Sequence, residues 1–520
     1  MNGKKIHRRQ MIKVSSLAGL SNLILPSFIS GKNLSRKINV HPDLKIPGSD
    51  TDICYLSALE MSSLLRAKKI SARELMKAHL KQIAKVNTKV NAIITMVPED
   101  ELMAKALTAD ELLAKGNPVG PLHGLPFVVK DLIETKGIRT TYGSPMWKDF
   151  IPTQDSLVVE REKKAGVIVI GKSNVPELGL GSQTFNPLFG PSFNPYDLSK
   201  TCGGSTGGGA VALACGMVPL TDGSDMGGSL RNPASFCNVV GLRPSPGRVP
   251  IVQSKLAWQE LSVQGPMARS VSDCAFLLSQ QAGPDPRSPI SIMQSPVEFL
   301  EPLQRNFKDV KIAFIKDLGL PWEKEVKEAV DSQKKVFESL GCIVEENEPD
   351  MTDANECFVG FRHWQTEAQY GDLLEGNSDK LNAYTKWHIA EGRKLTGTYL
   401  SRLEIKRSAL YRRFQQFLEK YEFLILPVSQ VLPFDVYEPY PKEIDGVKML
   451  TYIDWMKSAY YISVVGNPAL SLPCAFSKKG LPIGMQIVGR HSADLSVLQL
   501  GFAFEQVTKI GERRPAVAVS

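Results

Sequence analysis

Three glycine-rich segments hold the residues whose types and spacing could do chemistry. Residues 166–173 read GVIVIGKS, residues 203–209 read GGSTGGG, and residues 222–233 read DGSDMGGSLRNP. The first matches the expression for a phosphate-binding loop, and the second matches the Gly-x-Ser-x-Gly turn of hydrolases that use a Ser-His-Asp triad. The second and third together offer two serines, Ser205 and Ser229, among glycines. Each motif supports its chemistry only if the surrounding sequence also predicts the local structure that this chemistry requires.

The phosphate-loop match in residues 166–173 fails on local structure. That motif works as a flexible loop whose backbone N–H groups surround phosphates. Here the four middle residues are Val-Ile-Val-Ile, which are stiff at χ1 and favour a strand. We therefore expect the segment to be a strand, and nucleotide binding is not predicted.

The Gly-x-Ser-x-Gly match around Ser205 is the alternative hydrolase chemistry. A nucleophile turn of that kind follows an apolar strand, whereas residues 194–202 read NPYDLSKTC and resemble a turn. Such an enzyme also needs a histidine after the serine, and the chain offers His363, His388 and His491. None has a convincing sequence neighbourhood, so this stays the second hypothesis.

The third interpretation joins the two serine segments to an upstream lysine. Residues 122–131 read LHGLPFVVKD, which places Lys130 at the end of an apolar run. Lys130 precedes Ser205 by 75 residues, and Ser205 precedes Ser229 by 24. With these blocks the chain resembles the amidase signature family over about residues 55–515. Further segments carry the same resemblance: GKSN at 171–174, GLRP at 241–244, GNPALSLP at 466–473 and GLPIGMQ at 480–486.

The resemblance implies a Lys130–Ser205–Ser229 triad. It implies that Ser229 is the nucleophile, that Ser205 relays the proton after a cis peptide bond from Gly204, and that Lys130 is the base. It also implies an oxyanion hole made by the backbone N–H groups of Met226, Gly227, Gly228 and Ser229. The physics fits, because burial lowers the pKa of a lysine and glycine lets the backbone turn its N–H groups to the substrate. Thr206 departs from the serine usual in the family but keeps a hydroxyl.

Other residues near the triad are assigned to scaffold or substrate. Asp225 and Arg231 flank the nucleophile and are expected to form an ion pair. Gly179 and Gly181 leave space near the site and are predicted to contact a bulky acyl group. Residues 353–420 are polar and helical in pattern, so they are predicted to form an insertion that covers the pocket.

The elements that must position these residues alternate between strands and helices. Ser71 and Glu74 form a capping box that starts a helix, and strand-like runs lie at 126–130, 167–170, 312–315, 423–428 and 485–488. Alternation of this kind predicts an α/β layered fold with a central sheet. The family resemblance implies a single large layered domain with a central mixed β-sheet flanked by helices, the amidase signature fold. We assign residues 32–520 to this domain.

Charge and composition narrow the remaining questions. Residues 1–37 hold eight Lys or Arg and no acid, which leaves 54 basic and 54 acidic residues in the rest of the chain. The neutral body does not favour nucleic-acid binding. Arg8 and Arg9 followed by an apolar run predict a twin-arginine export signal over residues 1–31 and a periplasmic location; without export the chain would be cytoplasmic.

The function expected from these observations is hydrolysis of a small aryl, alkyl or peptide amide through a serine acyl-enzyme. No metal and no organic cofactor are expected, because the eight cysteines are scattered without a Cys-x-x-Cys pair. No apolar stretch is long enough for a membrane span, and a homodimer is compatible with the sequence. The alternatives are a glutaminase-type subunit of a tRNA-dependent amidotransferase and a Ser-His-Asp α/β-hydrolase.

Overall fold

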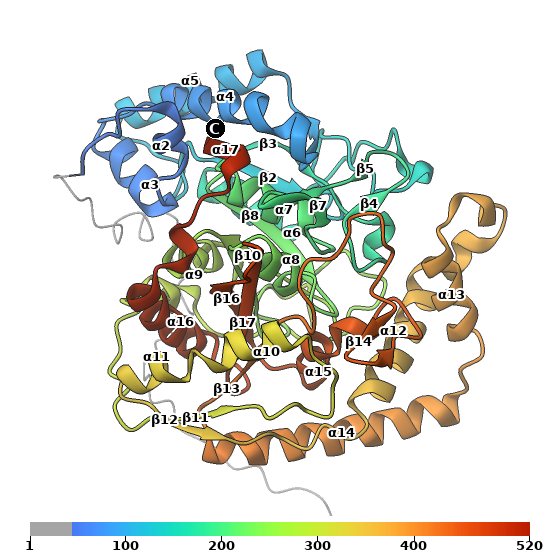
Figure 1. Cartoon of the computed structure of the whole chain (residues 1–520). Coiled ribbons are helices and arrows are strands. Elements are labelled where there is room, and N and C mark those ends of the chain that lie inside the picture. The colour runs from blue at the N-terminus through green and yellow to red at the C-terminus, as the bar shows by residue number, and fades with distance from the viewer. Residues whose placement is uncertain (1–43, 520) are drawn as a thin grey trace, which may run out of the picture.

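A mixed sheet of eleven strands runs through the centre of the molecule and is flanked by helices (Figure 1). The computed structural model describes residues 44–519. In sheet order the strands are β1 (Ile93–Met96), β3 (Ile168–Ser173), β2 (Pro126–Lys130), β8 (Leu220–Asp225), β10 (Val263–Ala268), β9 (Val240–Arg243), β16 (Ala469–Phe476), β17 (Pro482–Val488), β13 (Phe423–Pro427), β11 (Lys311–Phe314) and β12 (Ile343–Glu346). The predicted α/β fold with a central mixed sheet is confirmed.

The sheet contains both parallel and antiparallel pairs, grouped in separate parts of it. Strand β2 pairs in parallel with both β3 and β8, and β11 pairs in parallel with β12 and β13. The six strands from β8 to β13 in sheet order are joined by antiparallel pairs. Three two-stranded sheets lie outside it: β4 (Phe185–Asn186) with β5 (Gly190–Pro191), β6 (Phe193–Asn194) with β7 (Asp197–Thr201), and β14 (Glu443–Ile444) with β15 (Val447–Lys448).

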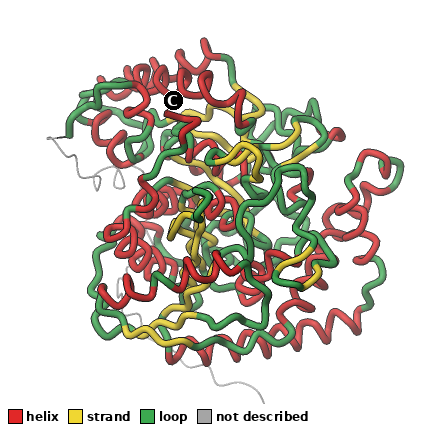
Figure 2. The backbone as a smooth tube through the Cα atoms, viewed as in Figure 1, coloured by secondary structure: helices red, strands yellow, loops and turns green. Residues whose placement is uncertain are grey.

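Helices enclose this sheet, as Figure 2 shows in red around the yellow strands. The α-helices are α2 (Asp50–Cys54), α3 (Ala58–Arg66), α4 (Ala72–Val90), α5 (Glu99–Ala114), α6 (Leu157–Ala165), α7 (Gly207–Ala214), α8 (Arg231–Phe236), α9 (Val271–Gln281), α10 (Lys324–Asp331), α11 (Lys334–Ser339), α12 (Ala354–Tyr370), α13 (Ala383–Gly392), α14 (Gly397–Lys420), α15 (Lys457–Val465), α16 (Asp494–Thr508) and α17 (Ala516–Val519). The 3₁₀ turns are η2 (Pro145–Trp147), η3 (Glu177–Gly179), η4 (Pro296–Leu300), η5 (Gly371–Leu374), η6 (Ser378–Lys380), η7 (Asp454–Met456) and η8 (Ile510–Glu512).

Local sequence explains where several elements begin. Helix α4 starts at the predicted capping box, in which the Ser71 hydroxyl accepts from the Glu74 N–H and the Glu74 carboxylate accepts from the Ser71 N–H. Strand β2 covers the predicted run without change, and every one of its five residues is buried. A strand with neighbours on both edges and helices over it favours such an apolar run.

The segment over residues 353–420 is helical, as expected, and forms α12, α13 and α14 (orange in Figure 1). Its parts differ in their relation to the pocket described below. Residues Arg362 to Leu373 line that pocket, whereas no residue of α13 or α14 is among its lining residues in the described chain. The wall is thus α12 with the turn η5 that follows it.

The remaining findings concern the N-terminal segment, the membrane and the cysteines. The predicted export signal over residues 1–31 lies outside the described residues. Within residues 44–519, none of the helices combines the length and the apolar character that crossing a membrane requires. All eight cysteines are free and buried.

Candidate active site

Lys130 is the last residue of β2, the strand that lies between β3 and β8. Its side chain is completely buried. The Nζ atom lies 2.8 Å from the Ser205 Oγ and 2.8 Å from the Thr206 Oγ1. It also lies 3.0 Å from the Ser224 Oγ and 3.3 Å from the Ser224 carbonyl oxygen. The structure therefore brings Lys130 and Ser205, which are 75 residues apart in sequence, into direct contact.

Burial gives Lys130 the protonation state that a base needs. It lowers the pKa of Lys130 from 10.5 to about 7, although the negative charges of Asp225 and Asp222 act to raise it. A substantial share of the side chain is then neutral near pH 7. In that form the two N–H bonds can donate to Thr206 and Ser224, and the lone pair can accept the Ser205 proton.

Ser205 enters the site from a tight glycine turn rather than from a strand of the main sheet. The Gly204–Ser205 peptide bond is cis, as the family resemblance implied. The strand before it, β7, belongs to a separate two-stranded sheet. This is not the strand-to-helix geometry of a Gly-x-Ser-x-Gly nucleophile turn.

The histidines of the alternative triad lie elsewhere. His388 accepts from the Arg362 guanidinium, and the two nitrogens of His363 are buried without a hydrogen-bond partner. His491 lines a different cavity, beside Arg407 and Tyr411. Within residues 44–519 no histidine hydrogen-bonds to Ser205 or Ser229, so the geometry does not assemble a Ser-His-Asp triad.

Ser229 lies in a turn between β8 and α8 that Asp225 holds in shape. One carboxylate oxygen of Asp225 accepts from the Gly228 N–H at 2.9 Å and the other from the Leu230 N–H at 3.2 Å. The expected ion pair is present, with Arg231 3.0 Å from Asp225, and Arg243 adds a second at 3.2 Å. Burial would raise the pKa of Asp225, but the two guanidinium charges outweigh it and hold that pKa well below its ordinary value. The carboxylate is thus an ionised anchor for the turn.

This turn determines which backbone N–H groups can receive an oxyanion. Within the described chain, the N–H groups of Met226, Gly227 and Ser229 make no hydrogen bond to protein, so they are free donors. The Gly228 N–H, which was also predicted for the oxyanion hole, already donates to the Asp225 carboxylate. A second contact, from the Thr206 N–H to the Ser229 carbonyl at 3.2 Å, ties the two serine segments together.

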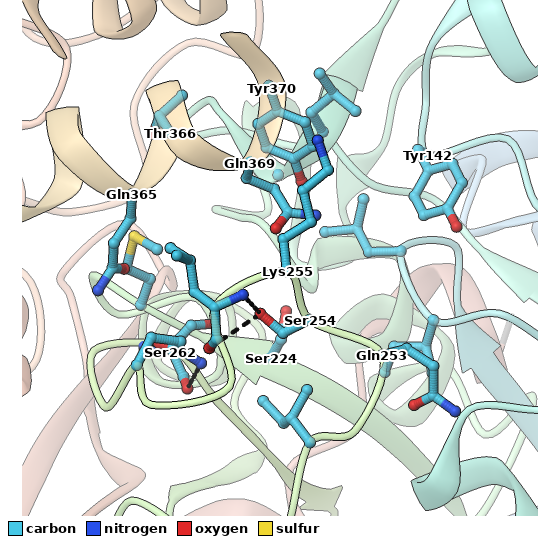
Figure 3. A pocket seen from close by; sticks show the side chains of 18 of the residues that line it. Tyr142, Ser224, Gln253, Ser254, Lys255, Ser262, Gln365, Thr366, Gln369 and Tyr370 are labelled. Atoms are coloured by element: carbon cyan, nitrogen blue, oxygen red, sulfur yellow. Dashed lines mark hydrogen bonds between the residues drawn. The ribbon is translucent and has the colours of Figure 1, made fainter. Parts of the chain in front are cut away.

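Both serines open into one cavity of about 450 Å³. Its apolar and aromatic lining residues include Leu132, Tyr142, Trp147, Leu178, Tyr370 and Leu373, and its glutamines are Gln253, Gln259, Gln264, Gln365 and Gln369. Figure 3 shows Gln365, Gln369 and Tyr370 reaching into it from one helix. The mixed lining suits an organic substrate that has both an apolar and a polar part.

The two glycines predicted to contact substrate have different positions. Gly179 lines the cavity, and a Cβ added there would lie 3.7 Å from the Ser205 Oγ and 2.8 Å from the Leu132 Cδ1. Gly181 is absent from the lining residues of the described chain, and a Cβ there would meet Pro176 instead. The space near Ser205 therefore depends on Gly179.

Sequence reasoning missed three side chains of this site. Ser224 contacts Lys130, Asp222 accepts the Lys130 backbone N–H at 2.7 Å, and Arg362 lines the cavity near Met226. The pairing of β2 with β8 places the first two beside Lys130. Arg362 shares no motif with the triad and could be found only once α12 was placed.

The segment that matched the phosphate-loop expression is a strand, as predicted. Residues Ile168–Ser173 form β3, and Lys172 is buried, with its Nζ donating to the Ile133 carbonyl and to the Thr135 hydroxyl at 3.0 Å. A Cβ at Gly171 would lie 2.0 Å from the Thr95 carbonyl oxygen, so this glycine serves strand packing.

Comparison with known proteins agrees with this geometry. A family model described as Amidase matches residues 74–498. An acylamidase of Rhodococcus erythropolis is 31% identical over 472 residues, which cover 90% of this chain and 98% of that protein. A glutamyl-tRNA(Gln) amidotransferase subunit of Alkaliphilus metalliredigens is 34% identical over 481 residues, covering 86% of this chain and 95% of that protein.

Structural comparison gives the same class. A bacterial aryl acylamidase of the amidase signature enzymes superposes with a TM-score of 0.84 at 26% identity, covering 90% of this chain and 99% of that one. The fold and the site define an enzyme that cleaves the carbon–nitrogen bond of an amide. The chain belongs to the amidase signature family.

Proposed function

We propose that this protein hydrolyses a small aryl, alkyl or peptide carboxamide through an acyl-enzyme on Ser229. The observation that carries the proposal is the contact of 2.8 Å between the Lys130 Nζ and the Ser205 Oγ, inside the cavity that Ser229 also lines. A base with a pKa of about 7 is thereby linked to a hydroxyl that faces the same space as the nucleophile.

The reaction follows from these positions. Neutral Lys130 takes the Ser205 proton while Ser205 takes the Ser229 proton, and the Ser229 Oγ attacks the amide carbonyl. The oxyanion accepts from the free N–H groups of Met226, Gly227 and Ser229. The proton returns through Ser205 to the leaving amine, the carbon–nitrogen bond breaks, and water then releases the acyl group by the same proton path.

A test of this assignment separates the two serines. A fluorophosphonate reagent should form its adduct on Ser229, both in the wild type and, more slowly, in Ser205→Ala. Ser229→Ala should lose turnover and labelling together, because the attacking oxygen is gone. Peptide mapping by mass spectrometry locates the adduct. An adduct on Ser205 would transfer the nucleophile role to the Gly-x-Ser-x-Gly segment.

A glutaminase-type component of an amidotransferase is the second candidate function. It is favoured by the identity of 34% with the Alkaliphilus metalliredigens protein, which is named as part of glutamyl-tRNA(Gln) amidotransferase. Against it stands the neutral charge of the body, with 54 basic and 54 acidic residues after residue 37. Steady hydrolysis of anilides by the isolated chain, with no response to tRNA, would favour the amidase.

We propose in addition that the chain is exported to the periplasm by the twin-arginine route. Support comes from Arg8 and Arg9 and the apolar run after them, which the described residues do not include. The homodimer stays a prediction that light scattering of the purified protein would check.

A further inference from the structure

Arg362, on α12, reaches the edge of the turn that carries the predicted oxyanion donors. Arg362 lines the same cavity as Ser205 and Ser229, and it is only 4% exposed. Its Nη1 atom lies 3.3 Å from the Met226 Sδ, and the guanidinium stands 5.9 Å from the centre of the Phe358 ring. A Cβ at Gly227 would be 2.9 Å from that same ring. The positive charge is therefore close to the reacting centre.

The protein partners of this charge are neutral. Arg362 donates to the His388 Nε2 at 3.1 Å, to the Tyr452 hydroxyl at 2.8 Å and to the Met226 sulfur. Burial and then the Arg362 charge hold the pKa of His388 well below its ordinary value, so this ring does not supply a compensating charge. Within residues 44–519 no carboxylate forms an ion pair with Arg362.

The contrast with the other buried arginines of the site is informative. Arg231 and Arg243 are fully buried, and both are paired with Asp225. A buried charge without a counterion is costly, so an anionic ligand that reached Arg362 would gain the compensation that Asp225 gives the other two arginines. Three of the five guanidinium N–H groups of Arg362 have partners, which leaves one on each terminal nitrogen.

The helix around Arg362 presents a polar stripe to the cavity. Gln365, Thr366 and Gln369 follow at the helical intervals of three, four and seven residues and line the same cavity (Figure 3). Glu134 is the one acid among the lining residues of the described chain, and it accepts from the Tyr142 hydroxyl at 2.6 Å. The α12 wall thus has donors and a positive charge but no acid.

We propose that Arg362 binds a carboxylate of the substrate, so that the preferred substrates are amides that also carry a carboxylate group. Two terminal N–H groups match two carboxylate oxygens, and such charge-assisted contacts fix orientation as well as affinity. Lys255 also lines the cavity, but it is half exposed and paired with Asp372 at 3.3 Å. The buried Arg362 therefore suits one negative charge, whereas a phosphate would bring a second. This inference rests on the proposed function, because it places the carboxylate relative to Ser229.

The test compares isosteric pairs that differ only in charge. Succinyl 4-nitroanilide carries a carboxylate on the acyl side, and 4-oxopentanoyl 4-nitroanilide replaces its O⁻ by a methyl group. 4-Acetamidobenzoate and 4-acetamidoacetophenone form the same pair on the amine side. In one of the two pairs we expect kcat/KM of the wild type to be about 10- to 100-fold higher for the anion. Arg362→Gln should remove that preference by lowering kcat/KM for the anion far more than kcat/KM for its neutral partner, while Arg362→Lys should retain part of the preference.

A matched control and a binding measurement keep the outcome decisive. Arg407 stands 5.6 Å from the Phe361 ring of the same helix and pairs with Glu260, outside the cavity, so Arg407→Gln should leave the preference unchanged. Binding of both pairs to Ser229→Ala, with and without Arg362→Gln, is measured by calorimetry and does not depend on turnover. Equal affinity for anion and neutral partner in both pairs would overturn the inference, and so would an equal loss for both partners in a folded Arg362→Gln protein. Failure to cleave any amide would instead overturn the proposed function. The calorimetric affinities would then decide alone whether Arg362 binds a carboxylate.

Discussion

Replacing Lys130 by methionine tests whether the buried amine is the base. Methionine is unbranched and of similar length, so it can fill the channel that the lysine stem occupies without adding a charge. The change removes the only group within hydrogen-bonding distance of the Ser205 Oγ that can take its proton in the described chain. Every other element of the site, including the Asp225 anchor, stays in place.

The expected size of the effect follows from the pKa. With a pKa of about 7, roughly half of Lys130 is neutral at pH 7, whereas a lysine with the ordinary value of 10.5 would be neutral in about three molecules of ten thousand. Burial therefore raises the amount of active base about a thousandfold. General-base catalysis contributes typically ~10²- to 10⁴-fold, and we expect kcat/KM of Lys130→Met to fall by about that factor.

The assay is a profile of kcat/KM from pH 5 to pH 10 with one anilide substrate. For the wild type the rate should rise about tenfold per pH unit below pH 6 and level off above pH 8, since only the neutral amine acts. Lys130→Met should lose this acid limb together with the rate. Lys420→Ala, which removes an exposed lysine paired with Glu345, should keep the wild-type profile.

Stability separates loss of chemistry from loss of fold. A lysine whose folded pKa is depressed binds fewer protons folded than unfolded between pH 7 and pH 10.5, so its contribution to stability improves as pH rises through that window. At pH 7 and below the buried lysine costs on the order of a few kcal/mol. Lys130→Met should accordingly melt at or above the wild-type temperature at pH 7. The reasoning would be refuted if this folded variant kept its rate while His363 or His388 variants lost the acid limb.

Three other changes give independent checks. Asp222→Asn should shift the acid limb only slightly, towards lower pH, because removing a nearby negative charge disfavours the Lys130 ammonium, whereas burial already raises the pKa of Asp222 to about 7 and leaves its carboxyl only partly charged there. The amide oxygen can still accept the Lys130 backbone N–H, and a shift to higher pH would contradict this reasoning. Gly179→Ala should lower kcat/KM, most for bulky substrates, because the new Cβ lies 3.7 Å from the Ser205 Oγ and 2.8 Å from Leu132 at a residue whose φ is +70°; unchanged selectivity across a series of acyl lengths would show that the substrate lies elsewhere. Arg8→Lys with Arg9→Lys should leave activity intact and retain a longer precursor in the cytoplasm, as fractionation and immunoblotting would show; normal export in a strain without the twin-arginine pore would contradict the proposal.

The parts of the fold that the sequence predicted are those with strong local patterns. The apolar run ending at Lys130 is β2, and the capping box at Ser71 starts α4. Strand β8 escaped prediction because it reads LTDGSD, with polar residues and a glycine where a buried strand favours apolar β-branched residues. Asp222 and Ser224 contact Lys130, and Asp225 anchors the oxyanion turn, so local propensity is weakest where the site is built.

In the site, too, residues in strong local patterns were predicted and residues placed by tertiary packing were not. The triad residues were predicted because each lies in a short block with a recognisable pattern, and the structure places Lys130 against Ser205 and Ser205 in one cavity with Ser229. The prediction that Gly228 serves the oxyanion hole could not take account of a side chain that competes for its N–H. Arg362 lies 133 residues after Ser229 and enters the cavity only through the packing of α12 on the Met226 turn. Contacts of that kind depend on tertiary structure alone.

The position of Asp225 explains why the site needs both arginines. Asp225 must be ionised to hold the N–H groups of Gly228 and Leu230, yet its charge also acts to raise the pKa of Lys130 and so opposes the base. Arg231 and Arg243 keep the carboxylate charged despite complete burial. Lys130 can then be neutral only because the loss of hydration inside the sheet outweighs the attraction of Asp225 and Asp222. A more hydrated Lys130 would keep its proton, so the dense packing around β2 is a condition of catalysis as much as of folding.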